Sequence, residues 1–302
     1  MHAFYSDQFV LPLPPGHRFP MEKYRLLRTR IAAELPAVRL CAPIAVSDQT
    51  LALAHDPLYI ARLTCGDLSR KEQMTIGFPW SLQMVERSRR SAGATVMACE
   101  KALTERVAVN LAGGTHHAHA DRGEGFCCFN DAVVASRVLQ HQHGVGPIAI
   151  IDLDVHQGNG TATMTEHDPM IFSLSLHGAT NYPFRKARSS LDIDLPDGTS
   201  DADYLDALDG ALATLAARFD PEFIIYLAGA DPFSDDRLGR LALSKSGLQA
   251  RDQRVFAFAE QHGLPVAVAM AGGYARTISD TVDIHFGTVS CALQYWQRHM
   301  NL

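Results

Sequence analysis

Short apolar runs alternate with longer amphipathic segments along most of this chain. The run 147–151, Pro-Ile-Ala-Ile-Ile, carries no polar side chain, which is typical of a parallel strand buried on both faces. Runs of this kind predict strands over residues 3–6, 39–44, 107–111, 148–152, 171–175, 191–195, 223–228 and 266–271. The longer segments between them predict helices over residues 20–35, 81–103, 131–141, 202–218, 245–262 and 278–299.

Strands and helices that alternate in this way form a mostly parallel sheet with helices on both faces. We therefore expect a three-layer α/β/α fold. The chain contains no internal repeat, low-complexity tract or linker-like stretch, so we expect one domain over residues 1–302. In folds of this class, ligands bind beyond the carboxyl ends of the strands.

Polar and glycine-rich segments follow four of the predicted strands. They are Gly113–His117, Asp152–Asn159, Ala228–Asp231 and Ala271–Tyr274. Because the carboxyl ends of parallel strands share one edge of the sheet, we expect the four segments to converge on one functional site.

The second of these segments indicates a metal ion. Alternation along an extended chain would point Asp152, Asp154 and His156 the same way, and an apolar core does not accommodate these groups without a partner. Asp154, His156 and Asp231 would supply three ligands with one open position, which is typical of catalytic Zn²⁺. Because the set contains no cysteine, Fe²⁺ and Mn²⁺ also fit. Taken alone, Asp231 could equally be a helix N-cap before Pro232.

Two adjacent histidines, His116 and His117, lie in the glycine-rich segment after a predicted strand. Such a pair is often an ordinary polar loop, but beside a metal ion an imidazole is a suitable general base for water. Asp152 could fix the tautomer of one imidazole, and Asn159 could orient the other without adding charge. Tyr274 is either a packing residue or a hydrogen-bond donor to an oxyanion opposite the metal.

The composition narrows the class of protein. The chain is 47% hydrophobic and 20% charged, with a formal net charge of −6, and no run of Lys or Arg offers a track for nucleic-acid phosphates. The acidic balance weakly favours cationic substrates.

No apolar stretch approaches the ~18–20 residues of a membrane span, and no signal-peptide pattern opens the chain. The 6 cysteines form no CxxC pair, so we expect reduced thiols in a cytoplasmic protein.

In combination, these motifs resemble those of the histone deacetylase superfamily. The resemblance is carried by Gly114–Ala118, Gly125–Cys127, Phe129–Asp131, Asp152–Gly160, Ser175–His177, Gly229–Asp231, Asp236–Gly239 and Gly272–Tyr274. Three earlier segments also fit the pattern: His17–Tyr24, His55–Tyr59 and Gly77–Ser81. The resemblance covers nearly the whole chain. Gln157-Gly-Asn159 and the short Gly-Gly-Tyr turn are most similar to the class IV branch and its bacterial relatives.

The resemblance implies an arginase-like α/β fold with an eight-stranded, mostly parallel sheet, which agrees with the strand count above. It implies a Zn²⁺ ion on the three ligands already named and a structural monovalent cation, usually K⁺, nearby. The expected K⁺ site comprises Asp152, Asp154, His156, Ser175 and Leu176. Gly125 and Phe126 would line an acyl-lysine channel, although Phe126 taken alone could be a core residue. The second wall would come from the aromatic segment 182–184, with Phe184 as the candidate.

The activity implied by the resemblance is a metal-dependent amidohydrolase that removes acetyl or longer acyl groups from lysine side chains. His117, paired with Asn159, would be the base, and His116, paired with Asp152, would stabilise charge. Class I members carry Asp at the position of Asn159, so His117 should be less basic here. Acetylpolyamines or other small acylated amines are alternative substrates, and a catalytically silent acyl-lysine binding module is the alternative from another class.

Overall fold

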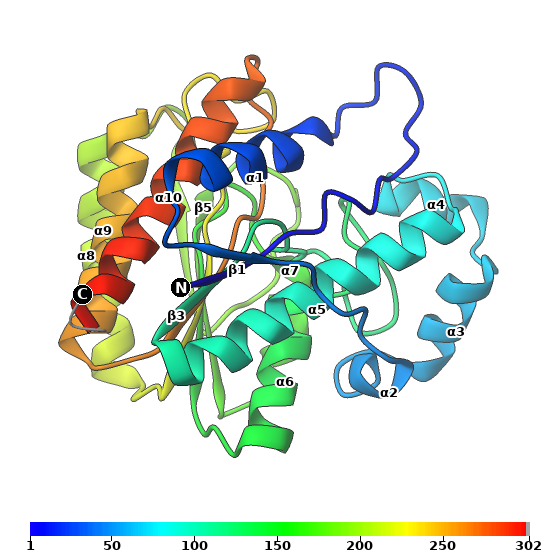
Figure 1. Ribbon diagram of the computed structural model, residues 1–302, viewed down its shortest axis with the longest axis horizontal. Coiled ribbons are helices and arrows are strands. Elements are labelled where there is room, and N and C mark those ends of the chain that lie inside the picture. The colour runs from blue at the N-terminus through cyan, green and yellow to red at the C-terminus, as the bar shows by residue number, and fades with distance from the viewer. Residues whose placement is uncertain (300–302) are drawn as a thin grey trace.

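Eight strands form one sheet in the computed structural model, which describes residues 1–299. Every neighbouring pair is parallel, and the order across the sheet is β2-β1-β3-β8-β7-β4-β5-β6. Figure 1 shows this sheet between two layers of helices. The strands are β1 (His2–Phe4), β2 (Arg39–Cys41), β3 (Val107–Asn110), β4 (Ile148–Asp152), β5 (Ile171–Gly178), β6 (Leu191–Leu195), β7 (Phe223–Leu227) and β8 (Val266–Ala269).

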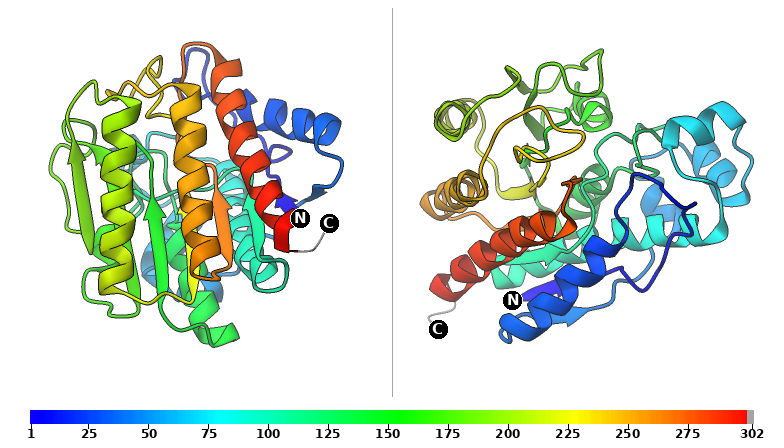
Figure 2. Two further views of the ribbon diagram at one scale, coloured as in Figure 1. Left: turned by 90° about the vertical axis from the view of Figure 1, so that its left-hand side faces the viewer. Right: turned by 90° about the horizontal axis from the view of Figure 1, so that it is seen from above.

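Helices cover both faces of the sheet. On one face α1 (Glu22–Glu34), α8 (Asp201–Arg218), α9 (Lys245–Gln261) and α10 (Ile278–His299) pack side by side, as Figure 2 shows. On the other face lie α5 (Leu82–Glu105) and α6 (Asp131–His143), which pack against each other. None of the helices within residues 1–299 is long and apolar enough to cross a bilayer.

The two faces explain why the central strands are apolar without interruption. In β4, Ala149 and Ile151 belong to the apolar cluster under α8–α10, whereas Ile148 and Ile150 belong to the cluster under α5 and α6. Successive side chains of a strand point to opposite faces, and here both faces are covered. Every residue of β4 and β7 is therefore buried.

The predicted strands and long helices are confirmed, with small shifts at their ends, and the sheet is parallel throughout. The sequence analysis misses four shorter helices: α2 (Asp48–Leu51), α3 (Pro57–Cys65), α4 (Arg70–Ile76) and α7 (Asn159–Thr165). Two of them begin with cap signals that are visible in the sequence. Asp56 caps α3 just before a proline, and Ser69 forms a capping box with Glu72 at the start of α4.

The loops that follow β3, β4, β5, β7 and β8 meet at the carboxyl edge of the sheet and line a cavity of about 1010 Å³. Segments 16–19, 74–78 and 125–129 form further parts of its wall, together with Leu11, Tyr24 and residues of α5. The four segments singled out in the sequence contribute to this cavity or lie directly beneath it. The buried end of this cavity is lined by the polar side chains of His116, His117, Asp154 and His156.

Candidate active site and metal centre

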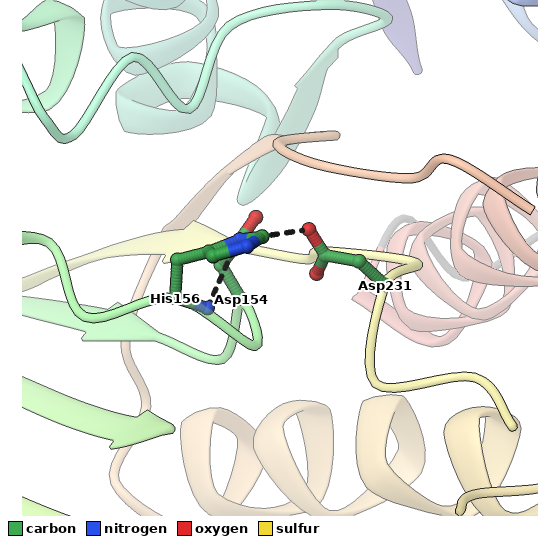
Figure 3. Close-up of side chains that lie close together, drawn as sticks. All are labelled: Asp154, His156 and Asp231. Atoms are coloured by element: carbon green, nitrogen blue, oxygen red, sulfur yellow. Dashed lines mark hydrogen bonds and ion pairs between the residues drawn. The ribbon is translucent and has the colours of Figure 1, made fainter. Parts of the chain in front are cut away.

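Asp154 and His156 follow β4, and Asp231 follows β7, the neighbouring strand in the sheet. All three side chains are buried, and their ligand atoms lie within 4.8 Å of one another (Figure 3). His156 Nδ1 is 2.9 Å from Asp154 Oδ1 and 3.3 Å from Asp231 Oδ2. The structure thus brings together the three residues that the sequence analysis chose as metal ligands.

Backbone N–H groups, rather than cationic side chains, hold the two carboxylates. Gly272 N–H donates to Asp154 Oδ2 at 2.7 Å, and Val155 N–H donates to Asp231 Oδ1 at 3.0 Å. The other oxygen, Asp231 Oδ2, is buried with no hydrogen-bond partner among the described residues. A Cβ at Gly272 would lie 1.9 Å from that oxygen, so only glycine fits beside it. An unpartnered buried carboxylate oxygen destabilises the fold, and a bound cation would remove that cost.

The electrostatics of this cluster favour a positive charge between the carboxylates. Burial, reinforced by repulsion from Asp154, raises the pKa of Asp231 to about 7. Burial opposes protonation of His156, but its hydrogen bond to Asp154 and its close approach to Asp231 outweigh burial and raise the pKa of His156 to about 10. A divalent cation would take the place of that proton. Two carboxylates and one imidazole suit Zn²⁺, and Fe²⁺ and Mn²⁺ accept the same donors.

His116 forms a buried ion pair with Asp152 beside the ligand cluster. His116 Nδ1 donates to Asp152 Oδ2 at 2.6 Å. Burial alone would lower the pKa of His116, but the negative charges of Asp152 and Asp154 raise it to about 9. His116 Nε2 lies 3.9 Å from Asp154 Oδ1. At neutral pH this imidazole is therefore a cation next to a ligand carboxylate.

His117 has a neutral partner instead. Its Nδ1 lies 2.7 Å from Asn159 Oδ1, and its ring centroid is 4.2 Å from that of His116. Burial, followed by the positive charges of His116 and His156, lowers the pKa of His117 well below the ordinary value. Two touching imidazoles thus differ in protonation near neutral pH, with His117 neutral and able to accept a proton.

Glu124 is a member of this site that the sequence analysis does not single out. One of its oxygens, Oε1, accepts a hydrogen bond from Asn159 Nδ2 at 3.1 Å and another from the Tyr182 hydroxyl. Its second oxygen lies 3.5 Å from His119 Nε2. The hydrogen bond with His119, followed by those with Tyr182 and Asn159, outweighs burial and lowers the pKa of Glu124 to about 2. Its position in the acidic loop just before Gly125-Phe126 is the only sequence signal.

One wall of the cavity is aromatic and contains Phe126. The backbone of Phe126 is in the left-handed region, with φ at 66°, and its N–H donates to the Ile76 carbonyl at 2.7 Å. Its ring centroid lies 5.2 Å from that of Phe78, 5.4 Å from that of Phe19 and 6.2 Å from that of Tyr274. The residue before it, Gly125, also lines the cavity.

Tyr182, rather than Phe184, lies against the histidine pair and forms a second wall of the cavity. The Tyr182 ring meets the edge of His117 at a centroid distance of 5.1 Å and an interplanar angle of 83°. Phe184 also lines the cavity, but its side chain is 87% exposed. Phe184 is therefore at the outer rim, and Tyr182 forms the inner part of this wall.

Tyr274 lines the cavity from the turn after β8. Asp236 fixes that turn, since its Oδ2 accepts the Tyr274 N–H at 2.6 Å while its Oδ1 accepts the N–H groups of Leu238 and Gly239. Buried Lys23 donates to the carbonyl of Gly273 at 3.2 Å. Burial, reinforced by nearby carboxylates, raises the pKa of the Tyr274 phenol, which therefore keeps its proton as a donor.

Arg251 holds the two ligand-bearing loops from beneath. It is fully buried, paired with Asp252, and donates to the carbonyls of Leu153 at 3.3 Å and Gly229 at 2.5 Å. No local pattern around Arg251 distinguishes it from a surface helix residue, so only the structure identifies this contact. It links the loop of Asp154 to that of Asp231.

The residues expected to bind K⁺ also lie next to one another. Asp152 and Ser175 are register partners between β4 and β5, and Leu176 is the next, buried residue. Asp152 Oδ1 accepts the Asp154 N–H at 3.2 Å, and Ser175 Oγ is 2.9 Å from His177 Nδ1. Binding of K⁺ there stays a prediction.

Comparisons with known proteins identify the family to which the chain belongs. The chain matches the histone deacetylase domain over residues 17–289. It is 40% identical over 283 residues to an uncharacterized protein of Picosynechococcus sp., covering 93% of this chain and 94% of that protein. It is 37% identical over 202 residues to histone deacetylase 2 of Arabidopsis thaliana, covering 65% of this chain and 52% of that protein.

A bacterial amidohydrolase and a solved structure are also similar to this chain. The chain is 30% identical over 288 residues to a histone deacetylase-like amidohydrolase of Pseudomonas aeruginosa, covering 88% of this chain and 74% of that protein. The crystal structure of an HDAC homolog from Aquifex aeolicus matches with a TM-score of 0.83 at 25% identity, covering 96% of this chain and 83% of that one. The chain, with its all-parallel eight-stranded sheet, thus belongs to the histone deacetylase family of hydrolases.

Proposed function

We propose that this protein is a metal-dependent lysine deacylase, which hydrolyses the amide bond between an acyl group and a lysine side chain in a peptide or protein. The observation that carries this proposal is a three-ligand metal site next to two touching histidines, one charged and one neutral. Family membership supports the hydrolysis of an acyl–amine bond. Zn²⁺ is the proposed ion, with Fe²⁺ as the alternative, and K⁺ is proposed as a second, structural ion.

The chain's own residues divide the proton transfers between them. When bound, the divalent ion would polarise the amide carbonyl and lower the pKa of a water molecule. His117 has its Nδ1 engaged by Asn159, so its Nε2 accepts the proton of the attacking water and later returns a proton to the leaving amine. His116, kept charged by Asp152, stabilises the negative charge that develops next to it. Tyr274 donates its phenol O–H to the oxyanion of the tetrahedral intermediate.

Two alternatives use the same cavity. In the first, the substrate is an acetylpolyamine or another small acylated amine. In the second, the protein binds acyl-lysine and does not turn it over. A binding module has no need of a neutral base at His117 or of a phenol donor at Tyr274, so the full set favours an enzyme.

The test is turnover of a fluorogenic acyl-lysine peptide by the metal-loaded protein, with acetylspermidine and a small acylated amine in parallel. We expect peptide hydrolysis that disappears in a His117→Ala variant, while that variant still binds the peptide. Binding of the peptide by the wild type with no turnover of any substrate would establish the silent binding module instead.

A further inference from the structure

The outer rim of the cavity carries positive charge. Three of the exposed residues that line it are arginines, namely Arg18, Arg237 and Arg240, and none is an aspartate or glutamate. In the described part of the chain, the only carboxylate in the whole lining is that of Asp154, which is buried at the floor as a metal ligand. The chain as a whole has a formal net charge of −6, so this rim is opposite in sign to the molecule around it.

Two of the three arginines form no ion pair with the described residues. Arg240 faces Asp197 across an exposed pair at 3.4 Å. Arg237 donates instead to the backbone carbonyl of Arg276 at 3.2 Å, and Arg276 is the residue that pairs with Asp235. Within residues 1–299, neither Arg18 nor Arg237 has a carboxylate within 4.0 Å.

The segment that leaves the rim adds further positive charge. Phe184, at the rim, is followed directly by Arg185, Lys186 and, two residues later, Arg188. Lys186 ties the segment down by donating to the carbonyls of Asn181 and Pro183, the latter at 2.8 Å. Arg185 and Arg188 are exposed and, within residues 1–299, have no ion-pair partner. The mouth therefore combines an exposed apolar side chain with two unpaired arginines, Arg18 and Arg237, and the segment that continues from it carries two more.

We infer that the rim selects acylated amines whose remaining part is anionic, either an acyl-lysine flanked by acidic residues or a small acylated amine that carries a carboxylate. This inference rests on the proposed function and names its substrate class. Guanidinium groups match carboxylates in geometry and charge, and a cleft lined by one sign of charge raises the local concentration of the opposite sign. The same field repels a polyamine, whose free amines are cationic. The rim therefore opposes the weak expectation of cationic substrates drawn from the overall charge.

The experiment compares substrates that differ only in charge. One arm uses acyl-lysine peptides flanked by two aspartates, two glutamines or two lysines. A second arm uses an Nα-blocked acyl-lysine with its α-carboxylate free or converted to a carboxamide, together with acetylspermidine. We expect kcat/KM to fall from the acidic to the basic peptide by about tenfold at low salt, with the difference shrinking at about 0.5 M NaCl.

Single charge reversals locate the effect. Arg18→Glu and Arg237→Glu should each reduce or reverse the preference for acidic substrate. Arg39→Glu is the matched control. Arg39 is exposed at the amino end of β2, whereas the cavity lies at the carboxyl ends of the strands, so this variant should keep the wild-type preference. A basic peptide or acetylspermidine processed as well as the acidic peptide would overturn the inference.

Failure of the inference and failure of the proposed function give different results. If the neutral peptide is hydrolysed and charge has no effect, the inference is wrong and the deacylase remains. If nothing is hydrolysed, the proposed function is wrong, and the charge order is then measured from peptide dissociation constants of the His117→Ala variant. Equal dissociation constants for acidic and basic peptides would overturn the inference in that case too.

Discussion

The Glu124 carboxylate determines which way the side-chain amide of Asn159 faces. Asn159 Nδ2 donates to Glu124 Oε1 at 3.1 Å, and this leaves Asn159 Oδ1 facing His117 Nδ1 at 2.7 Å. An ionised carboxylate can only accept hydrogen bonds, so the opposite amide orientation would set two acceptors against each other. Because Asn159 Oδ1 can only accept a hydrogen bond, His117 Nδ1 must carry the proton. The Nε2 atom of His117 is then unprotonated and free to act as the base.

Glu124→Gln should therefore lower kcat, because a glutamine can donate as well as accept and no longer enforces this orientation. We expect a loss of ~10–100-fold, by analogy with the range for residues that orient metal-ligating histidines. Nitrogen NMR of the metal-free protein should show His117 shifting from one tautomer toward a mixture. Glu166→Gln is the control, since Glu166 is exposed at the end of α7, the helix that begins at Asn159. An unchanged tautomer in Glu124→Gln would show that Glu124 does not act through Asn159.

The two histidines should respond differently to deletion. His117→Ala removes the base and should abolish nearly all turnover, whereas His116→Ala removes only a stabilising charge and should retain more. Rates of both variants, measured at equal metal content, test the division of roles. Greater residual activity in His117→Ala than in His116→Ala would reverse it.

Asn159→Asp should move the acidic limb of the kcat/KM profile to higher pH. A carboxylate at 159 would stabilise the protonated form of His117 and so raise its pKa, which burial and the neighbouring charges hold below the ordinary value. Because the base must be unprotonated to act, a higher pH is then needed to free it. Profiles of the wild type and the variant between about pH 5 and 9 measure the shift. A limb that stays in place would mean that His117 does not set it.

Tyr274→Phe should lower kcat by ~100-fold or more, the scale of one lost oxyanion donor. The affinity for substrate should change much less, because this hydrogen bond forms fully only in the transition state. Steady-state kinetics together with a direct binding measurement separate the two effects. A kcat equal to that of the wild type would show that Tyr274 only packs in the aromatic wall and does not act as a donor.

Activity should depend on a divalent ion held by Asp154, His156 and Asp231. A chelator should remove activity, Zn²⁺ or Fe²⁺ should restore it, and Asp231→Ala should lower the metal content. Gly272→Ala should lower it as well without changing a ligand, because its Cβ would lie 1.9 Å from Asp231 Oδ2. Gly210→Ala in α8 is the matched control, since nothing lies within 4 Å of the added Cβ. Full activity in a verified metal-free sample would contradict the site.

The channel should accept acyl groups longer than acetyl. The cavity of about 1010 Å³ is lined by apolar side chains such as Leu11, Phe19, Phe78 and Met84, which suit an alkyl chain. The measurement compares kcat/KM for acetyl-, decanoyl- and myristoyl-lysine in one peptide. A value for acetyl-lysine well above the other two would contradict this prediction.

The pattern of apolar and polar residues along the chain predicts the strands, the long helices and the types of residue that form the site. The strand 148–152 is visible because covered strands must be apolar on both faces, and the polar residues after it are visible because they interrupt that apolar pattern. The short helices α3 and α4 were not predicted, because a few turns carry too little apolar periodicity even where caps are present. Family resemblance supplied the pairing of His116 with Asp152 and of His117 with Asn159.

The sequence led us to expect that Asp231 would meet Asp154 and His156, but the strand order that brings them together, and most other contacts between distant residues, came only from the tertiary structure. Asp231 reaches Asp154 and His156 because β7 lies beside β4, a neighbour relation that depends on the order of strands in the sheet. The contacts of Glu124 with Asn159 and Tyr182, and of Arg251 with the ligand loops, join segments far apart in the chain. The cationic rim likewise forms where arginines from separate loops meet, and the overall charge of −6 gives no indication of it. Hydrophobic periodicity is set by immediate neighbours, whereas these contacts exist only once the whole sheet has assembled.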